Sequence, residues 1–378
     1  MPREPLVSIC MPSFNHARYL PFAIESALAQ TYRNIELVIV DDGSTDGSLN
    51  IAERYASRDP DRVRVFTHAR HASRGISATA NRAFRESRGA YWCGLCSDDV
   101  FVRDKVERQV TFLQQHPEIG MVYGEVATID EGGRKVGRLA ARDLSSDRWP
   151  FARLLEENYI YGQAAMVRRA CLEAVGLHDE QLIYSDWELW IRILARYNVA
   201  FLPGTVTYYR VHARNTSLGQ SPRIQLDRHL QVMRAIELKA PAIDHALGQR
   251  FNGGVLQLQL AYLYFCAGNE RAATRALEAA VGVAPELLRN TGFLAGWLFR
   301  RQAQTAWFGG APAMDFIAWF AEQALPLVPG ATDPSAVSTR RRLRYTVLLA
   351  RLAARAWQRG RSLRDSVKLC ARPRREVG

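Results

Sequence analysis

Residues 91–100 read YWCGLCSDDV and hold two pairs of side chains that could do chemistry. Cys93 and Cys96 have the C-x-x-C spacing of thioredoxin-like redox sites and of half a zinc site. Asp98 and Asp99 follow directly, and carboxylates are ligands for hard cations such as Mg²⁺ and Mn²⁺. The two pairs predict different chemistry, and the rest of the chain decides between them.

The cysteine pair lacks the partners that its chemistry needs. A structural zinc site takes four ligands, and the sequence holds no second C-x-x-C or Cys/His cluster at suitable spacing. Side chains alternate across a strand, so a strand over residues 90–97 would point Cys93 and Cys96 to opposite faces. We therefore expect both cysteines to be small, buried apolar side chains.

Alternating strand-like and helix-like segments position the acidic pair. Strands are predicted over residues 6–12, 35–42, 63–68, 90–97 and 121–126. Helices are predicted over residues 19–30, from the GSTDGS turn to residue 54, and over 76–87 and 102–116. This alternation is typical of an α/β layer structure with a largely parallel sheet. Beyond it, helices are predicted over residues 151–157 and 186–196, and a strand over 206–212.

Three polar clusters fall at the carboxyl ends of the predicted strands, where open α/β sheets bind ligands. They comprise residues 13–15, 41–42 and 98–99. A solvated turn would explain Asp98 and Asp99 taken alone. Adjacent carboxylates repel each other, however, and a cation or hydrogen bonds usually compensate. With a second acidic turn, VDDGSTDGS, at the same edge, the pattern favours a divalent cation that shares its ligands with phosphate oxygens.

Four motifs carry a resemblance to a known family. In order they are PSFNHARYL, IELVIVDDGSTDGS, RGISATANRAFRESRGAYWCGLCSDD and YSDWELWIRI, within residues 6–218. Their order and spacing resemble the family 2 glycosyltransferases with the GT-A fold, a Rossmann-like, mostly parallel sheet flanked by helices. The resemblance implies metal-dependent, inverting transfer of a single sugar, as in bacterial surface polysaccharide synthesis. The alternative is a non-catalytic sugar-nucleotide-binding or scaffold protein.

The resemblance also implies partners. The donor would be a nucleoside diphosphate sugar, a UDP- or dTDP-sugar, and the acceptor a hydroxyl of a saccharide or a lipid-linked molecule. The donor site would comprise Pro12, Ser13, Asn15, Asp41, Asp42, Arg74, Gly75 and Asp98. Asp99 and Asp98 would hold Mn²⁺ or Mg²⁺ on the diphosphate, with His212 as a further metal or diphosphate contact.

Asp186, in SDWELW, resembles the family's catalytic base, which deprotonates the acceptor hydroxyl. The structural alternative is an acid in the first turn of a helix, which is electrostatically favourable whatever the function. Two departures from the family pattern stand out. Cys96 occupies a position where many relatives carry an acid, and Thr79-Ala80-Asn81 stands where many carry Ala-Arg-Asn. Arg74 or Arg82 could supply the missing guanidinium.

From about residue 223 the chain is predicted to be all-helical. Residues 260–285, LAYLYFCAGNERAATRALEAAVGVAP, have the spacing of a tetratricopeptide (TPR) repeat, and an ordinary helical hairpin explains them equally well. We expect a glycosyltransferase domain over residues 1–220 and a TPR-like helical domain over 221–335 that could bind a protein partner. Residues 336–378 would form a basic amphipathic helix and tail.

Charge is concentrated at the end of the chain. The whole sequence carries a net charge of +12, and residues 340–378 alone hold thirteen Arg and Lys against two acids. A basic amphipathic helix suits an anionic membrane surface, and a helix packed on the helical domain is the alternative. No nucleic-acid-binding module is recognisable. With six scattered cysteines, no evident signal peptide and no apolar run of ~20 residues, we expect a cytoplasmic protein, peripheral on the inner face of the cytoplasmic membrane.

Overall fold

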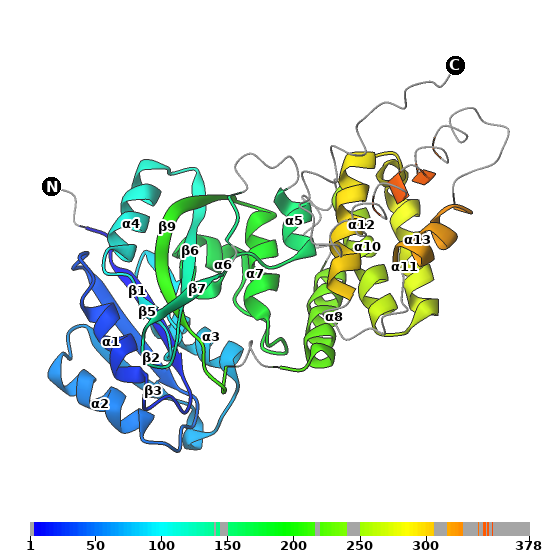
Figure 1. Ribbon diagram of the computed structural model, residues 1–378. Coiled ribbons are helices and arrows are strands. Elements are labelled where there is room, and N and C mark those ends of the chain that lie inside the picture. The colour runs from blue at the N-terminus through cyan, green and yellow to red at the C-terminus, as the bar shows by residue number, and fades with distance from the viewer. Residues whose placement is uncertain are drawn as a thin grey trace. The chain divides into compact units, whose positions relative to one another are not determined.

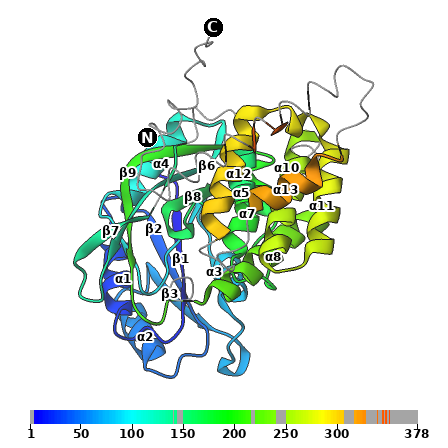
Figure 2. The same cartoon turned by 45° about the vertical axis from the view of Figure 1, so that its right-hand side comes forward.

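The structure is a computed structural model, and it describes six stretches of the chain and six single positions. The stretches are residues 4–139, 141–143, 150–215, 220–239, 250–305 and 316–327, and the single positions are Thr339, Leu343, Arg344, Thr346, Val347 and Ala350. The chain forms two compact units, Met1–Gly219 and Gln220–Gly378. Figures 1 and 2 show them in two views with the elements labelled.

A nine-stranded sheet is the centre of the first unit (Figure 1). One half of it is parallel, in the order β3-β2-β1-β4, with the bounds Val63–Thr67, Ile35–Asp41, Val7–Ser13 and Tyr91–Gly94. The sequences of β1 and β2, VSICMPS and IELVIVD, are almost continuously apolar, as expected for strands that are covered on both faces. The predicted α/β class is confirmed.

The other half of the sheet is mixed, which the sequence did not predict. β8 (Ala165–Arg168) runs antiparallel to β4, and β6 (Ile119–Ile129) runs antiparallel to β8. β9 (Asn198–Arg210) is parallel to β6, and β5 (Val100–Phe101) is antiparallel to β9. β7 (Lys135–Leu139) pairs with β6.

Helices cover both faces of the parallel half. Leu20 and Ile24 of α1 (Leu20–Leu28), Ala52 of α2 (Ser48–Arg58) and Val106 of α4 (Lys105–Gln115) share one core with the odd-numbered side chains of β1. Helix α3 (Ile76–Glu86) packs on β1 and β2 outside that core. Because side chains alternate along β1, the strand packs against α1, α2 and α4 on one face and against α3 on the other.

Strand β4 ends at Gly94, three residues earlier than predicted, because the chain must turn to let β5 pair with β9. Asp98 and Asp99 therefore lie in a turn between two strands. The prediction that both cysteines are buried holds for Cys93 and is wrong for Cys96, which is only partly buried. Cys96 lies beyond the strand, so the alternation rule does not apply to it.

The described part of the first unit also contains the short helices α5 (Pro150–Glu156), α6 (Arg169–Val175) and α7 (Ser185–Leu194) and the single turn η2 (Gly162–Ala164). Another turn, η1 (Ala69–His71), follows β3. Two fully buried tryptophans anchor α7. Trp187 Nε1 donates to the Leu154 carbonyl at 2.6 Å, and Trp190 Nε1 donates to the Ile160 carbonyl at 3.0 Å. These contacts fix the start of α7, where Asp186 lies.

The second unit is helical. It comprises α8 (Pro222–Leu238), α10 (Arg250–Cys266), α11 (Glu270–Val283), η3 (Pro285–Leu288), α12 (Thr291–Thr305) and α13 (Phe316–Ala324). The predicted hairpin is α10 and α11, which turn at Gly268, where φ is +73°. Asn269 then caps α11 through the Ala272 N–H at 3.1 Å.

The predicted basic tail, residues 336–378, lies outside the described residues apart from the six single positions. In the described part of the chain, none of the helices combines the length and the apolar character needed to span a bilayer.

Candidate active site

The three polar clusters meet at one edge of the sheet. Ser13 and Asp41 are partners in the β1–β2 register, and the Asp42 N–H donates to the Ser13 carbonyl at 2.8 Å. The turn after β4 joins them, because His16 Nδ1 lies 2.8 Å from Ser97 Oγ. The topology of parallel strands therefore brings together the residues that the sequence predicted to converge.

Asp41 is held through only one of its carboxylate oxygens. Oδ1 accepts from the Gly43 and Ser44 N–H groups at 3.1 and 2.9 Å and lies 2.9 Å from His71 Nε2. Oδ2 is buried and, among the described residues, has no hydrogen-bond partner, and the same is true of Ser13 Oγ. Buried polar atoms are rarely left unpaired, so these two atoms mark where a ligand could donate or accept a hydrogen bond.

Asp42, in contrast, is satisfied by the protein itself. Its carboxylate accepts from four donors in one loop and the following helix: Ser73 Oγ (2.9 Å), Arg74 N (2.6 Å), Gly75 N (3.0 Å) and Thr79 Oγ1 (2.9 Å). Asp42 thus fixes the 73–75 loop, which presents the exposed side chain of Arg74. Thr79, one of the departures from the family pattern, is part of this network.

Two further predicted residues also have structural contacts. Asn15 adopts a positive φ of +52°, its N–H donates to Ser44 Oγ at 2.9 Å, and its Oδ1 accepts from the Thr45 N–H at 2.8 Å. Asn15 therefore ties the loop after β1 to the turn after β2. Arg82 donates to the Thr67 carbonyl and lies over the Phe66 ring. Arg74 is thus the more available of the two arginines considered for the diphosphate.

Asp99 is fully buried, and its Oδ1 accepts from the Arg210 N–H at 2.8 Å. Its Oδ2 contacts no hydrogen-bond donor in the part of the chain that the structure describes. Burial, and then the charge of Asp98, raise the pKa of Asp99 well above its usual value. A buried carboxylate whose charge is disfavoured gains most from a cation, so Asp99 Oδ2 fits a metal ligand.

Asp98 lies among nitrogen donors. Its Oδ2 is 3.0 Å from His212 Nε2, 3.5 Å from Asn215 Nδ2 and 3.8 Å from His16 Nε2. Among the described residues, two groups of three side chains bring possible ligand atoms within 4.8 Å of one another, namely His16–Asp98–His212 and Cys96–Asp98–Asp99. The carboxylates and imidazoles fit Mn²⁺ or Mg²⁺. His16 was missed by the sequence reasoning, although it lies inside the quoted PSFNHARYL motif.

Asp186 lies in the first turn of α7, as the structural alternative also required. Its carboxylate accepts from the Trp187 N–H at 2.7 Å and from Asn158 Nδ2 at 3.4 Å. Although part of the residue is exposed, protein atoms crowd the carboxylate, and this burial raises its pKa from 3.8 to about 6. A carboxylate with such a pKa can accept a proton near neutral pH.

Cys96 links Asp186 to the acidic turn. Although part of the Cys96 residue is exposed, protein atoms packed around its thiol raise the pKa well above 9, and the charges of Asp99, Asp98 and Asp186 each raise it further. All three carboxylates therefore lie within electrostatic reach of one thiol, which is held in its neutral form.

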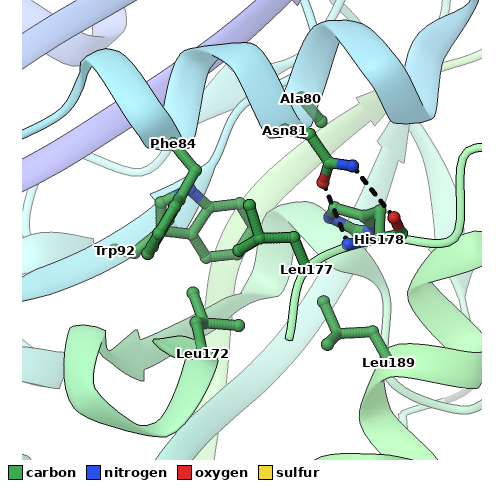
Figure 3. A pocket seen from close by; sticks show the side chains of 8 residues that line it. All are labelled: Ala80, Asn81, Phe84, Trp92, Leu172, Leu177, His178 and Leu189. Atoms are coloured by element: carbon green, nitrogen blue, oxygen red, sulfur yellow. Dashed lines mark hydrogen bonds between the residues drawn. The ribbon is translucent and has the colours of Figure 1, made fainter. Parts of the chain in front are cut away.

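A small pocket lies beside this site, between α3, α6 and α7 (Figure 3). It is lined by Ala80, Asn81, Phe84, Trp92, Leu172, Leu177, His178 and Leu189. Asn81 and His178 exchange two hydrogen bonds of 2.9 Å across it. Burial lowers the pKa of His178 to about 4, so the ring is neutral. None of the lining residues is acidic, and the pocket is a packing feature that supports the start of α7.

The fold resembles that of the GT-A-type glycosyltransferases. Staphylococcus aureus TarS, residues 1–349 in complex with UDP-GlcNAc, superposes with a TM-score of 0.55 at 17% identity, over 94% of this chain and 92% of that chain. The mannosyltransferase PcManGT from Pyrobaculum calidifontis, in complex with GDP-Man and Mn²⁺, gives 0.51 at 19% identity, over 93% and 88%. At these identities the likeness concerns the fold.

Sequence comparison places the chain within a family. The model of glycosyl transferase family 2 matches residues 8–176. An uncharacterized glycosyltransferase of Rickettsia prowazekii is 30% identical over 228 residues, 57% of this chain and 68% of that protein. One from Haemophilus influenzae is 33% identical over 186 residues, 48% and 71% of the two chains. The chain belongs to the family 2 glycosyltransferases, and it is a sugar-transferring enzyme.

Proposed function

We propose that the enzyme moves a single sugar, with inversion, from a nucleoside diphosphate sugar to a hydroxyl of a saccharide or lipid-linked acceptor. The observation that carries this proposal is the buried Asp98–Asp99 pair, in which Asp99 Oδ2 contacts no hydrogen-bond donor among the described residues, together with Asp186, whose pKa is raised to about 6. A single displacement requires two parts. One is a base whose pKa lies below neutral pH, and the other is a pair of ligands for a cation.

The nucleotide would lie across the ends of β1 and β2. Ser13 Oγ can donate to it and Asp41 Oδ2 can accept from it, since the described residues provide neither atom with a hydrogen-bond partner. Pro12 and Asn15 shape the same edge. Asp42 would act through the 73–75 loop, by holding the Arg74 guanidinium and the Gly75 backbone near the diphosphate. TarS was solved with UDP-GlcNAc, which supports a UDP- or dTDP-sugar as the donor here.

Asp99 and Asp98 would hold Mn²⁺ or Mg²⁺, with His212 against Asp98. When bound, the ion neutralises charge that develops on the departing diphosphate. Arg210 supports this arrangement. Its N–H contacts Asp99, and its guanidinium Nε donates to the Asp98 carbonyl at 2.9 Å, so the side chain fixes the backbone of the acidic turn.

Asp186 would take the proton of the acceptor hydroxyl as the new bond forms. One base on the face opposite the leaving group produces inversion in a single displacement. The Asn158 amide and the Trp187 N–H orient the carboxylate. Gly162 lies beside the carboxylate, since a Cβ at that position would be in ordinary van der Waals contact with Asp186 Oδ2, at 3.6 Å.

The proposed setting is bacterial surface polysaccharide synthesis, in the cytoplasm or at the inner face of the cytoplasmic membrane. The basic residues 340–378 would bind anionic lipid, and the helical unit would bind a protein partner.

Incubation of the full chain with Mn²⁺ and a panel of UDP-, dTDP- and GDP-sugars tests this proposal. Calorimetry detects donor binding, and hydrolysis or transfer of the sugar detects catalysis. We expect binding of one nucleotide class that depends on the cation, together with turnover. Binding without turnover across a panel of saccharide and lipid-linked acceptors would contradict the proposed transfer, and absence of binding would contradict the proposed donor.

A further inference from the structure

We infer that Ser77 and Ser185 are positioning residues that hold the proposed base, Asp186, in place relative to the 73–75 loop. This inference rests on the proposed function, because it assigns two further residues to the same reaction. It is carried by buried hydrogen bonds that connect α3 with the first turn of α7. Neither serine belongs to the donor-site, metal or base residues that the sequence predicted.

The two serine hydroxyls belong to one buried chain of hydrogen bonds. Ser77 Oγ, on α3, donates to the Leu182 carbonyl at 2.6 Å and lies 2.7 Å from Ser185 Oγ. Ser185 Oγ lies 3.0 Å from His178 Nδ1. Because a hydroxyl carries a single proton and that of Ser77 goes to the carbonyl, Ser185 donates to Ser77. The Ser185 oxygen then accepts the Nδ1–H of the His178 ring, so every donor in the chain has an acceptor.

A second set of contacts holds the segment before α7 on α3. Asn81 Nδ2 donates to the His178 carbonyl and to Glu180 Oε1, each at 2.9 Å. Asn81 Oδ1 accepts from the His178 N–H at 2.9 Å, and Figure 3 shows the two bonds between these residues. Residues 178–185 are therefore attached to α3 at both ends, by Asn81 at the first end and by Ser77 at the last.

The start of α3 is fixed on its other side by Asp42. The Asp42 carboxylate accepts at 3.0 Å from the N–H of Gly75, the residue that precedes the helix. Ser77 is the second residue of the helix. The first turn of α3 therefore joins the 73–75 loop to the start of α7, and it sets the proposed base relative to the proposed diphosphate contact.

The surroundings of Asp186 depend on the place of this turn. Asp186 is the second residue of α7, and its carboxylate accepts from the Trp187 N–H and from Asn158 Nδ2. Cys96 and Tyr161 feel its charge, and burial and then nearby carboxylates raise the pKa of the thiol and of the hydroxyl, so both groups stay neutral. The packed protein atoms raise the pKa of Asp186 to about 6. A shift of α7 away from α3 would admit water, misplace the base and lower that pKa.

The first test compares Ser77→Ala, Ser185→Ala and the double variant with the unaltered full chain. Turnover is measured with Mn²⁺ and the sugar donor that the unaltered protein uses. We expect each single variant to lower kcat about tenfold or more, with a nearly unchanged KM for the sugar donor, because Asp42 still holds the 73–75 loop. The double variant should be no slower than the slower single variant, since either change breaks the same chain. Ser57→Ala, an exposed hydroxyl on α2, is the matched control.

A second measurement needs no substrate. Carbon-13 NMR of protein labelled at the aspartate carboxyls gives the pKa of Asp186, whose signal is the one that Asp186→Asn removes. We expect a value near 6 in the unaltered protein and in Ser57→Ala, and a value closer to 3.8 in each serine variant of the chain. Circular dichroism and thermal unfolding establish that a variant folds, and either single variant is sufficient for the test.

The outcomes separate this inference from the proposed function. An Asp186 pKa that stays near 6 in Ser77→Ala and Ser185→Ala would overturn the inference, whatever the change in kcat, and would leave the proposed function intact. Additive losses of kcat in the double variant would also overturn it, because the two serines would then act through separate contacts. Absence of turnover in the unaltered protein, or full turnover in Asp186→Asn, would instead overturn the proposed function.

Discussion

Replacement of Asp186 by Asn should slow the enzyme and stabilise it at the same time. The amide nearly matches the carboxylate in shape and can still accept from the Trp187 N–H. It cannot accept the proton of the acceptor, so we expect kcat to fall by about 10²–10⁴ while donor binding stays near that of the unaltered protein. In the unaltered enzyme, kcat should fall about tenfold per pH unit below pH 6.

The stability effect follows from the raised pKa of Asp186. Its value is 3.8 in the unfolded chain and about 6 in the folded protein, so between these values the folded state binds more protons. Stability from this group is therefore fully present below about pH 3.8 and is lost as the pH rises through about 6. A shift of this size corresponds to at most about 3 kcal/mol, and partial exposure of the side chain reduces it.

Asp186→Asn removes this loss of stability at higher pH. We expect the variant to be more stable than the unaltered protein at pH 7.5 by about 1–3 kcal/mol, and equally stable at pH 3.8. Urea unfolding at a series of pH values, followed by tryptophan fluorescence, measures the difference. Glu173→Gln, an exposed carboxylate on α6, is the control and should change neither quantity.

Two results would refute this reasoning. A stability difference that does not change with pH would show that the pKa of Asp186 is not raised in the folded protein. A kcat for Asp186→Asn within a few-fold of the unaltered value would remove Asp186 from the role of base, whatever the stability shows.

Three further predictions concern the rest of the site and the tail. Asp99→Asn should abolish Mn²⁺-dependent donor binding in calorimetry, because the ion loses a buried ligand, whereas Cys96→Ser should retain it; the reverse pattern would place the ion on the thiol. Asp42→Asn should weaken donor binding about tenfold and expose the bond after Arg74 to trypsin, since two backbone N–H groups lose a charged acceptor. Unchanged cleavage would contradict that role. Deletion of residues 340–378 should abolish sedimentation with anionic vesicles at low salt and leave donor binding unchanged; an intact chain that ignores such vesicles would exclude the lipid role.

Much of the first unit could be predicted from local sequence. The continuous apolar run IELVIV specifies a strand that is buried on both faces, and the helical spacing around Ile24 specifies a helix that is buried on one face. The position of the site also follows from sequence, because parallel strands place their carboxyl ends at one edge. That rule places residues 13–15, 41–42 and 98–99 together from the sequence alone. The mixed half of the sheet could not be predicted from local sequence, because β8 and β9 pair with strands that are far away along the chain.

The contacts and the pKa of each polar group depend on tertiary structure. Asp41 and Asp42 are adjacent and identical in type, yet the 73–75 loop satisfies only Asp42. His16 lies beside Asp98 across 82 positions of sequence because two strand ends meet. The pKa of Asp186 is set by the protein atoms packed around it. Hydrogen-bond partners and burial depend on how distant segments pack, so the sequence determined which residues gather at the site, and only the folded structure determined which of their atoms remain available to a ligand.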